Sequence, residues 1–322
     1  MPAPRVLFVK LSSLGDVIHH LPAVTDLARA RPDAHIAWAV EEAYAGLVRL
    51  HPSVVDAIPV GLRALRRAPL SGAAWRRFRA ARRALRRAPW DFVVDTQGLL
   101  KSAYIASVAH GPSFGQDRAS ARERLAARCY DVRIRVPRDL HAVERNRRLV
   151  AGVFGYPLES AVDYGLVAPA APPAWAPAGP YVVLLHAASH AAKRWAEDRW
   201  IELGRTLAQE GHAIVLPGGT DAERASAARL AQAIPGALAA PAMDLVEAAA
   251  LLGHASGVVG VDTGLTHLAV ALRVPTVGIY CATNPALTGL HGGADAVNVG
   301  GAGAPPTVEA VLQAIGTRAR VE

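Results

Sequence analysis

The chain has 322 residues, of which 52% are hydrophobic, and a formal net charge of +8. A chain of this length can bury a large core and suggests two domains of ordinary size. Its two cysteines, Cys129 and Cys281, lie far apart without metal-type spacing, which argues against disulfides and zinc and predicts free thiols. No apolar stretch approaches membrane-spanning length, and the run Arg5 to Leu11 is too short for a signal peptide, so we expect a cytosolic protein.

Strands and helices alternate along the first part of the chain, which predicts a parallel sheet. An apolar run from Arg5 to Leu11 indicates the first strand, and a helical pattern follows near Val17 to Ala30. Further strands are expected at His35 to Val40 and at Phe92 to Asp95. These elements predict an amino-terminal Rossmann-like domain over residues 1–170.

The positive charge is concentrated in one block. Between Asp56 and Asp91 the chain has no acidic residue, while arginines crowd positions 63 to 87. Apolar residues recur inside this block at helical spacing, at Ala74, Phe78, Ala81 and Leu85. The pattern predicts a basic amphipathic helix, which can lie on an anionic membrane face or bind a phosphorylated lipid headgroup. The alternative is a solvated basic surface without a partner.

A proline-rich stretch, residues 168–180, predicts a semi-rigid linker. Elements of a second alternating series are expected at Tyr181 to His186, Asp198 to Glu210, Ala213 to Leu216, Ala222 to Ala233, Leu245 to Leu252, Val258 to Val261, Leu265 to Leu272 and Thr276 to Tyr280. Residues 171–322 are thus predicted to form a second Rossmann-like domain, and both parallel sheets should direct their functional loops into a cleft between the domains. The segment after Thr307 should form one helix, which packs either on its own domain or back on the first.

The exit of the first strand carries no dinucleotide fingerprint. No G-x-G-x-x-G follows the strand, and no G-x-x-x-x-G-K-[ST] occurs in the chain. We therefore expect neither a nicotinamide or flavin enzyme nor a phosphate-loop ATPase. Asp16 stands at the start of the next helix, where it either caps that helix or acts as a carboxylate general base.

The most informative segment lies in the second half, at Val259 to His267. A buried strand ends there in the turn Asp262-Thr263-Gly264, and a helix that contains His267 begins immediately afterwards. A helix start of this kind presents free N–H groups and a positive dipole end to an anion such as phosphate. An ordinary capped turn is the alternative.

Two other strand exits in this half carry polar groups. Ser189 and Lys193 follow the strand that ends at Leu185, and they could hold diphosphate oxygens, with the lysine offsetting charge on a leaving group. Glu223 opens a helix after a glycine turn, where it either complements the helix dipole or binds a ribose or sugar hydroxyl. An exposed polar loop is the alternative for the first of these segments.

Five different sequence blocks follow one another along the chain, at Ser12 to Asp16, Asp95 to Ala103, His141 to Arg145, Lys193 to Trp195 and Val261 to His267. Together they resemble the type I lipopolysaccharide heptosyltransferases of glycosyltransferase family 9. The resemblance implies a GT-B fold and inverting transfer of L-glycero-D-manno-heptose from ADP-heptose to the first Kdo of Kdo2-lipid A, without a metal or other cofactor. It places the enzyme in lipopolysaccharide inner-core biosynthesis, peripherally on the cytoplasmic face of the inner membrane.

The same resemblance assigns roles to individual residues. Asp16 becomes the base that deprotonates the acceptor hydroxyl, and Lys193 a catalytic cation at the diphosphate. Donor contacts fall at Ser189, Lys193, Glu223, Met243, Asp262, Thr263, Gly264 and His267. Acceptor contacts fall at Ser13, Gly15, Arg63, Lys101, Arg122, His141 and Arg145. The Arg-rich segment 63–87 is expected to contact the anionic membrane surface, and no nucleic acid partner is expected.

Two segments depart from the family pattern. Ala188-Ser189 stands where relatives carry paired threonines, and Cys281 to Pro285 replaces a Gly-Pro-Thr-Asp-Pro sequence. The main alternative is heptosyltransferase II, which adds heptose to heptose, although the Ser-Leu-Gly-Asp and Val-Asp-Thr-Gly-Leu loops of this chain favour type I. A basic nucleic-acid-binding protein and a non-catalytic sugar-nucleotide binder are further alternatives.

Overall fold

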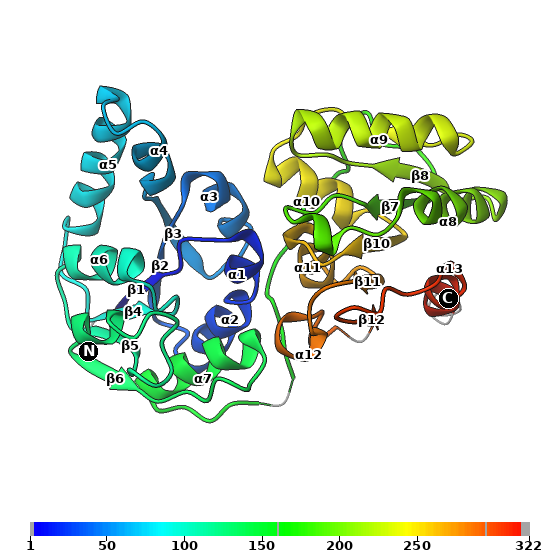
Figure 1. The fold of residues 1–322 in the computed structure, drawn as a ribbon. Helices are drawn as coiled ribbons and strands as arrows, with labels where there is room; N and C mark the ends of the chain where they lie inside the picture. The colour runs from blue at the N-terminus through cyan, green and yellow to red at the C-terminus, as the bar shows by residue number, and fades with distance from the viewer. Residues whose placement is uncertain (1–2, 160, 294, 317–322) are drawn as a thin grey trace. The chain divides into compact units, whose positions relative to one another are not determined.

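The structure, a computed structural model, describes residues 3–159, 161–293 and 295–316. The chain divides into two compact units, Met1–Val167 and Ala168–Glu322, and the division coincides with the start of the proline-rich stretch. Each unit contains one six-stranded sheet whose paired strands are all parallel among the described residues (Figure 1). The predicted α/β class with two parallel, Rossmann-like sheets is confirmed.

The first sheet has the strand order β3-β2-β1-β4-β5-β6. Its strands are β1 (Arg5–Val9), β2 (His35–Val40), β3 (Val54–Pro59), β4 (Phe92–Asp95), β5 (Ser113–Gln116) and β6 (Val132–Ile134). The central strands β1 and β2 are almost wholly buried, because helices cover both faces of the sheet. This explains their continuous apolar sequences.

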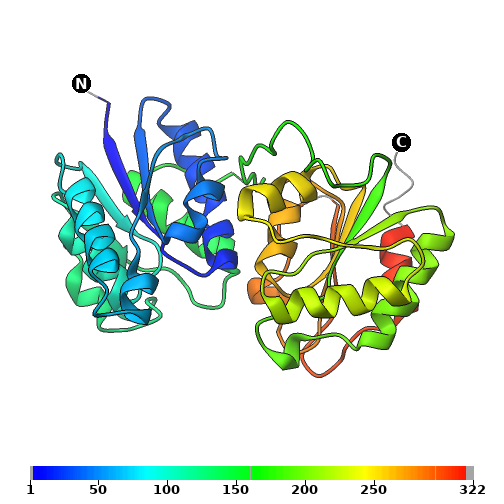
Figure 2. The same ribbon diagram turned by 90° about the horizontal axis from the view of Figure 1, so that it is seen from above.

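Helices of the first unit lie on both faces of the sheet (Figures 1 and 2). On one face, α5 (Gly72–Leu85) and α6 (Leu100–Val108) bury Phe78, Leu85 and Ile105 against Leu7 and Val9. On the other, α2 (Leu21–Ala30) packs against α7 (Ala142–Phe154). The remaining helices are α1 (Leu14–Ile18), α3 (Glu42–Val48), α4 (Leu62–Arg67) and the 3-10 turn η1 (Ala126–Cys129).

The helix expected over Val17 to Ala30 is two helices. Helix α1 ends at Ile18, and helix α2 begins at Leu21 with Pro22 in its first turn. Proline has no N–H to donate to the carbonyl of Ile18, so the helix stops and restarts. The predicted basic helix, in contrast, is confirmed as α5, and its buried residues are the expected Ala74, Phe78, Ala81 and Leu85.

The second sheet has the strand order β12-β11-β10-β7-β8-β9. Its strands are β7 (Tyr181–Leu185), β8 (Ala213–Leu216), β9 (Leu238–Ala239), β10 (Gly257–Val261), β11 (Thr276–Tyr280) and β12 (Ala296–Gly300). Counted from the first strand of its own unit, this order repeats that of the first sheet. The central strands β7, β10 and β11 are again buried and apolar.

In the second unit, α8 (Glu197–Gln209), α9 (Asp221–Ala233) and α13 (Val308–Gly316) cover one face of the sheet. On the other side, α10 (Leu245–Gly253) and α11 (Gly264–Ala271) lie together (Figure 2). The unit also contains the 3-10 turn η2 (Ala191–Lys193) and α12 (Pro285–Thr288).

The last helix, α13, has its buried residues within the core of the second unit. Val308 and Val311 of α13 are buried in one cluster with Val277 and Ile279 of β11. The described part of this helix therefore packs on its own unit. Residues 317–322 lie outside the described part of the chain.

Candidate functional site

The loops at the carboxyl ends of the strands in the first unit carry all the acceptor residues expected from the sequence. Ser13, Gly15 and Asp16 follow β1, and the loops or helices after β3, β4, β5 and β6 carry the others, Arg63, Lys101, Arg122, His141 and Arg145. Because all these strands are parallel, their carboxyl ends lie at one edge of the sheet. The structure thus places this basic set at the edge where ligands bind in such folds.

Asp16 has the capping role that the sequence left open as one of two. Its Oδ2 accepts hydrogen bonds from the backbone N (2.9 Å) and Oγ (3.1 Å) of Ser13, the residue that caps α1. Its Oδ1 lies 3.5 Å from Nη1 of Arg122. The carboxylate is therefore held in a fixed orientation by the cap while its second oxygen faces a cation and solvent.

The loop that carries Asp16 is clamped from the exit of β4. The Gln97 side chain accepts from the backbone N of Leu11 at 2.8 Å through Oε1, and its Nε2 donates to the carbonyl of Ser12. Asp95, fully buried, accepts in turn from the backbone N of Gln97 at 2.8 Å. Lys101 Nζ donates to Ser12 Oγ at 3.0 Å. Lys101 was expected as an acceptor residue, but no role was expected for Gln97. The only signal for Gln97 in the sequence is its position after a strand.

Lys10 is a further residue that sequence reasoning left without a role. Its buried ammonium donates to the carbonyl of Thr96 at 2.9 Å and to Oδ1 of Asn146 at 3.1 Å. Burial lowers the pKa of Lys10 to about 8, although the charges of Asp16 and Asp95 oppose the shift. Lys10 therefore joins the β1 and β4 exits to α7 beneath the Asp16 loop.

Arg63 is anchored at the exit of β2. Its Nη1 donates to the hydroxyl of Tyr44 at 2.8 Å, and its backbone N donates to the carboxylate of Glu41 at 3.1 Å. Burial raises the pKa of Glu41, and the nearby charges of Arg63 and Lys101 offset part of that rise. Burial and the charge of Arg63 lower the pKa of Lys101, while Glu41 and Asp16 oppose them. These groups form one electrostatically linked set.

His141 and Arg145 are fixed near the start of α7. His141 caps that helix, because its Nδ1 accepts from the backbone N of Val143 at 3.2 Å. Arg145 Nη2 donates to the carbonyl of Ser120 at 2.7 Å, and burial lowers the pKa of the Arg145 guanidinium. The start of α7 therefore presents the imidazole of His141 and the guanidinium of Arg145 at defined positions.

Asp262 is the centre of the site in the second unit. Its Oδ2 accepts from Lys193 Nζ and from Thr283 Oγ1, each at 2.7 Å, and His267 Nε2 lies 3.5 Å from its Oδ1. Burial acts to raise the pKa of Asp262, but the hydrogen bonds of His267, Lys193 and Thr283 hold it well below its ordinary value. The structure therefore brings together Lys193, Asp262 and His267, as expected, and adds Thr283, which the sequence analysis did not identify.

Thr263 and Gly264 open α11 beside this cluster. Thr263 is the N-cap residue, but its side chain makes no capping hydrogen bond. Gly260, in the preceding strand, has no room for a side chain, because a Cβ there would lie 2.3 Å from Thr266 Oγ1. The close packing of β10 on α11 fixes where the first N–H groups of this helix point.

Glu223 has a clear structural role. Its Oε2 accepts from the backbone N of Gly219 and of Thr220, each at 2.9 Å, while Thr220 Oγ1 accepts from the N of Glu223. This reciprocal capping box satisfies the start of α9 and orders the glycine turn after β8. The interpretation that Glu223 complements the dipole of α9 is thus supported. One oxygen of its carboxylate, Oε2, already accepts two hydrogen bonds.

Ser189 and Met243 lie on loops after β7 and β9, Ser189 exposed and Met243 half-buried. His186, directly after β7, was expected as the end of a strand and not as a site residue. Its imidazole is buried without a regular hydrogen bond, and burial lowers its pKa. These residues share the carboxyl edge of the second sheet with Lys193 and Asp262.

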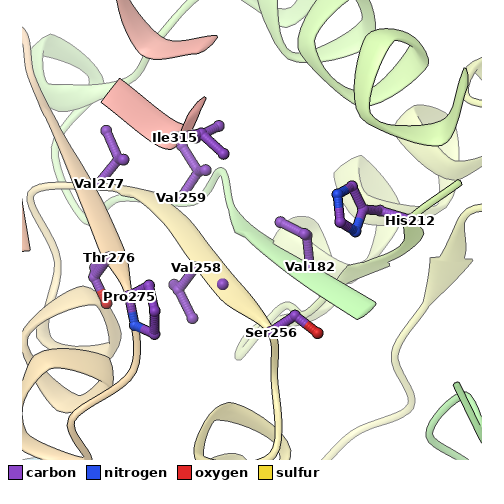
Figure 3. A pocket seen from close by; sticks show the side chains of 10 residues that line it. Val182, His212, Ser256, Val258, Val259, Pro275, Thr276, Val277 and Ile315 are labelled. Atoms are coloured by element: carbon purple, nitrogen blue, oxygen red, sulfur yellow. The ribbon is translucent and has the colours of Figure 1, made fainter. Parts of the chain in front are cut away.

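One cavity of the second unit lies away from this edge. It has a volume of about 70 Å³ and is lined by Val182, Val258, Val277 and Ile315, among others (Figure 3). Its polar members His212 and Ser256 precede β8 and β10, so the cavity lies at the amino edge of the sheet. It is therefore separate from the candidate functional loops.

Comparison with known proteins agrees with the two-sheet architecture. The model of glycosyltransferase family 9 (heptosyltransferase) matches residues 78–311. The chain belongs to this family. Lipopolysaccharide heptosyltransferase 1 of Pseudomonas aeruginosa is 45% identical over 89% of this chain and 81% of its own length. The same enzyme of Escherichia coli K12 is 40% identical over 89% of this chain and 91% of its own length.

Solved structures of family 9 proteins extend the similarity to the whole fold. The structure of the E. coli heptosyltransferase WaaC with ADP has a TM-score of 0.89 and 38% identity, covering 98% of this chain and 99% of that one. A structure of E. coli heptosyltransferase II, at 20% identity and a TM-score of 0.78, shares the fold. The expected GT-B type architecture and glycosyltransferase activity are confirmed for this family 9 chain.

The described residues contain neither a metal-type cluster of side chains nor a helix that could span a membrane. Across residues 3–159, 161–293 and 295–316, no group of three or more His, Cys, Asp or Glu side chains has an arrangement that could hold a metal ion. Over the same ranges, no helix has the length and apolar character needed to cross a bilayer. The thiols of Cys129 and Cys281 are free, as predicted.

Proposed function

We propose that this chain is a type I lipopolysaccharide heptosyltransferase that moves L-glycero-D-manno-heptose from ADP-heptose to the first Kdo of Kdo2-lipid A. The observation that carries the proposal is the 40–45% identity to heptosyltransferase 1 enzymes over 89% of the chain. The charge of the candidate site supports it. The acceptor has carboxylates and phosphates, and the first unit presents arginine and lysine side chains at its ligand-binding edge.

The donor site is assigned to the second unit. The diphosphate of ADP-heptose is bound by Lys193 and the first N–H groups of α11, with His267 and Ser189 adjacent, while Glu223 and Met243 contact the nucleoside. Lys193 has a partner, Asp262, that holds its ammonium at a fixed position. A cation placed in advance stabilises the negative charge that develops on the departing ADP without reorganisation during the reaction.

The base is assigned to Asp16. The acceptor hydroxyl loses its proton to Oδ1, the oxygen not engaged by the Ser13 cap, as the hydroxyl oxygen attacks the anomeric carbon of the heptose. Attack on the face opposite to the leaving ADP inverts the configuration at that carbon. The acceptor held on the first unit must reach the donor held on the second for this step to occur.

We further propose that no metal is required, because Lys193 and the start of α11 supply the positive charge that a divalent ion otherwise provides. Retention of full activity after exhaustive chelation is the expected result. Loss of activity in the chelator and its return with a divalent ion would contradict the proposal. The anomeric configuration of the product, measured by NMR, tests inversion separately.

The assignment of Asp16 is tested by ADP release from ADP-heptose with and without Kdo2-lipid A. Asp16→Asn keeps an oxygen for the Ser13 cap but removes the charge, and we expect it to lower acceptor-dependent release by about 100-fold or more. Asp33→Ala is a suitable control, because Asp33 is exposed and precedes β2 at the opposite edge of the sheet. Equal release by wild type and Asp16→Asn would remove Asp16 from the chemistry while keeping the transferase.

The same assay separates the two enzyme types. Release that depends on Kdo2-lipid A supports type I, whereas release only with an acceptor that already carries heptose supports type II. No release with either acceptor, despite ADP-heptose binding, would indicate a non-catalytic binder.

We also propose that the protein acts on the cytoplasmic face of the inner membrane and contacts its anionic surface through the Arg-rich segment 63–87. The exposed arginines of α4 and α5 support this location. Binding to anionic vesicles that weakens as salt rises, with little binding to neutral vesicles, is the expected behaviour.

A further inference from the structure

The arginines of segment 63–87 form two surfaces with different surroundings. Arg63 is held by Tyr44 and Glu41, and Arg77 Nη1 lies 3.4 Å from Oε2 of Glu42. These side chains point toward the exits of β2 and β3. Arg79, Arg82 and Arg83 form no ion pair with any described residue. This second group has positive charge that the protein itself does not neutralise.

The unpaired arginines occupy one side of α5. Positions 75, 79, 82 and 86 follow each other at spacings of four, three and four residues, which places them in one row along a helix. Arg79, Arg82, Arg83 and Arg86 line a recess of about 410 Å³. The Nε of Arg82 is buried without a hydrogen-bond partner among the described residues. The recess is therefore suited to anionic groups.

Exposed apolar side chains lie at one end of this row. Trp75, at its first position, is 42% exposed, and its Nε1 is already satisfied by the carbonyl of Pro69. Tyr104 of α6 is 48% exposed. Both rings pack on the buried Phe78, with centroids 6.2 and 6.4 Å away. Leu70, just before α5, is 98% exposed.

The unpaired arginines and the exposed apolar side chains are together better suited to an anionic bilayer surface than to water. Tryptophan and tyrosine favour the boundary between lipid headgroups and acyl chains, since their rings are apolar and their tips polar. Arginine pairs with lipid phosphates and can extend its charged end to them while its stem covers apolar surface. Leu70 lies in the short connection Ala68-Pro69-Leu70-Ser71 between α4 and α5, where its side chain is almost fully exposed.

We propose that Leu70, Trp75 and Tyr104, together with the four arginines that line the recess, form an interfacial anchor. The apolar side chains enter the headgroup boundary of a bilayer of anionic phospholipid, and the arginines bind its phosphates. This inference rests on the proposed peripheral location but adds an apolar component to it. Because salt screens charges and does not weaken apolar burial, part of the binding persists at high salt.

The test is cosedimentation of the full chain with phosphatidylcholine vesicles that contain phosphatidylglycerol, at low salt and at about 0.5 M salt, where the Debye length is only a few Å. The anchor variant is Leu70→Ser with Trp75→Ser, and the charge variant is Arg79→Gln with Arg83→Gln. Leu287→Ser and Arg148→Gln are matched controls, because Leu287 is also 42% exposed and Arg148 is an exposed arginine of α7. Far-UV circular dichroism and ADP binding verify that each variant is folded.

We expect the anchor variant to lose at least about fivefold of the binding that persists at high salt, in keeping with one or two buried apolar side chains. The charge variant should lose mainly the binding seen at low salt. If the anchor variant binds like wild type while the charge variant does not, the anchor is wrong and purely electrostatic attachment remains. If the wild type binds no vesicles, both the anchor and the peripheral location fail. Displacement from vesicles by single-stranded oligonucleotide would overturn the anchor in favour of nucleic acid binding.

Discussion

The Nζ of Lys193 and the Oδ2 of Asp262 lie 2.7 Å apart and join the loop after β7 to the loop after β10. The carboxylate is almost buried, and three donors from three different segments surround it, since Thr283 of the loop after β11 and His267 of α11 also approach it. Asp262 is therefore both a structural centre of the second unit and the group that sets the position of the lysine. Removing its charge should be detectable in stability as well as in donor binding.

Asp262→Asn should lower the free energy of unfolding at pH 7 by about 1–3 kcal/mol, because Lys193 then lacks its counter-charge. The pKa of Asp262 is lower in the folded than in the unfolded chain, so the carboxylate stabilises the fold above the unfolded pKa of about 3.9. That contribution is lost as pH falls below this value. Urea unfolding of wild type and variant at pH 7 and at pH 3.5 measures the contribution of the carboxylate to the free energy of unfolding. Asp221→Asn, in an exposed position, is the control.

A second prediction concerns Gln97. Gln97→Met keeps the length of the side chain but removes both hydrogen bonds to the Asp16 loop. We expect kcat to fall by about tenfold or more, while the affinity for ADP, bound by the other unit, stays unchanged. Steady-state kinetics and ADP titration give the two values. A parallel loss of ADP affinity would indicate general damage to the fold and contradict a positioning role.

Lys10 gives a prediction in the alkaline range. Its folded pKa of about 8 lies below its unfolded value, so the unfolded chain binds more protons between about pH 8 and 10.4. Burying the charged ammonium therefore weakens the fold below pH 8, and the penalty disappears as pH rises toward 10.4. Relative to wild type, Lys10→Met should lose up to about 3 kcal/mol of stability between pH 7 and pH 10.4. A difference that is constant with pH would show that Lys10 titrates normally.

The two thiols should differ in reactivity. Cys129 is exposed, whereas Cys281 is partly buried and burial raises its pKa, which leaves less of the reactive thiolate. Limited alkylation of the folded chain followed by peptide mass spectrometry should label Cys129 first, by roughly an order of magnitude in rate. In denaturant the difference should vanish. Equal labelling of both thiols in the folded chain would place Cys281 in a more open environment than the structure shows.

The sequence predicts the centre of each unit well and its periphery poorly. Strands such as Phe92–Asp95 and Thr276–Tyr280 are buried on both faces and therefore carry an apolar signal with clear ends. Edge strands do not: Val132–Ile134 is largely exposed and has no such pattern. Helix α7 was missed for a related reason, since its buried Arg147, paired with Asp26 at 2.7 Å, interrupts the apolar periodicity.

The residues of the candidate site likewise divide into those that the sequence predicts and those that it does not. The positions of Asp16 and Asp262 after strands were enough to place them, because parallel strands collect their exits at one edge. Thr283 and Gln97 could not be found in this way. Their roles depend on which carboxylate or backbone group lies within 3 Å after folding, and the distances along the chain, 21 residues for Thr283 and Asp262, carry no such information. Side-chain partners across loops require the structure.

The repeated strand order of the two sheets has a practical consequence for protein engineering. The division between Val167 and Ala168 crosses no strand pairing of either sheet, because each sheet is built wholly from its own part of the chain. A hybrid enzyme joined at this point to the complementary half of another family 9 protein would keep every ladder hydrogen bond of both parents. Acceptor preference and donor preference could then be exchanged between enzymes as separate modules, with the folding of each hybrid checked by its cooperative unfolding.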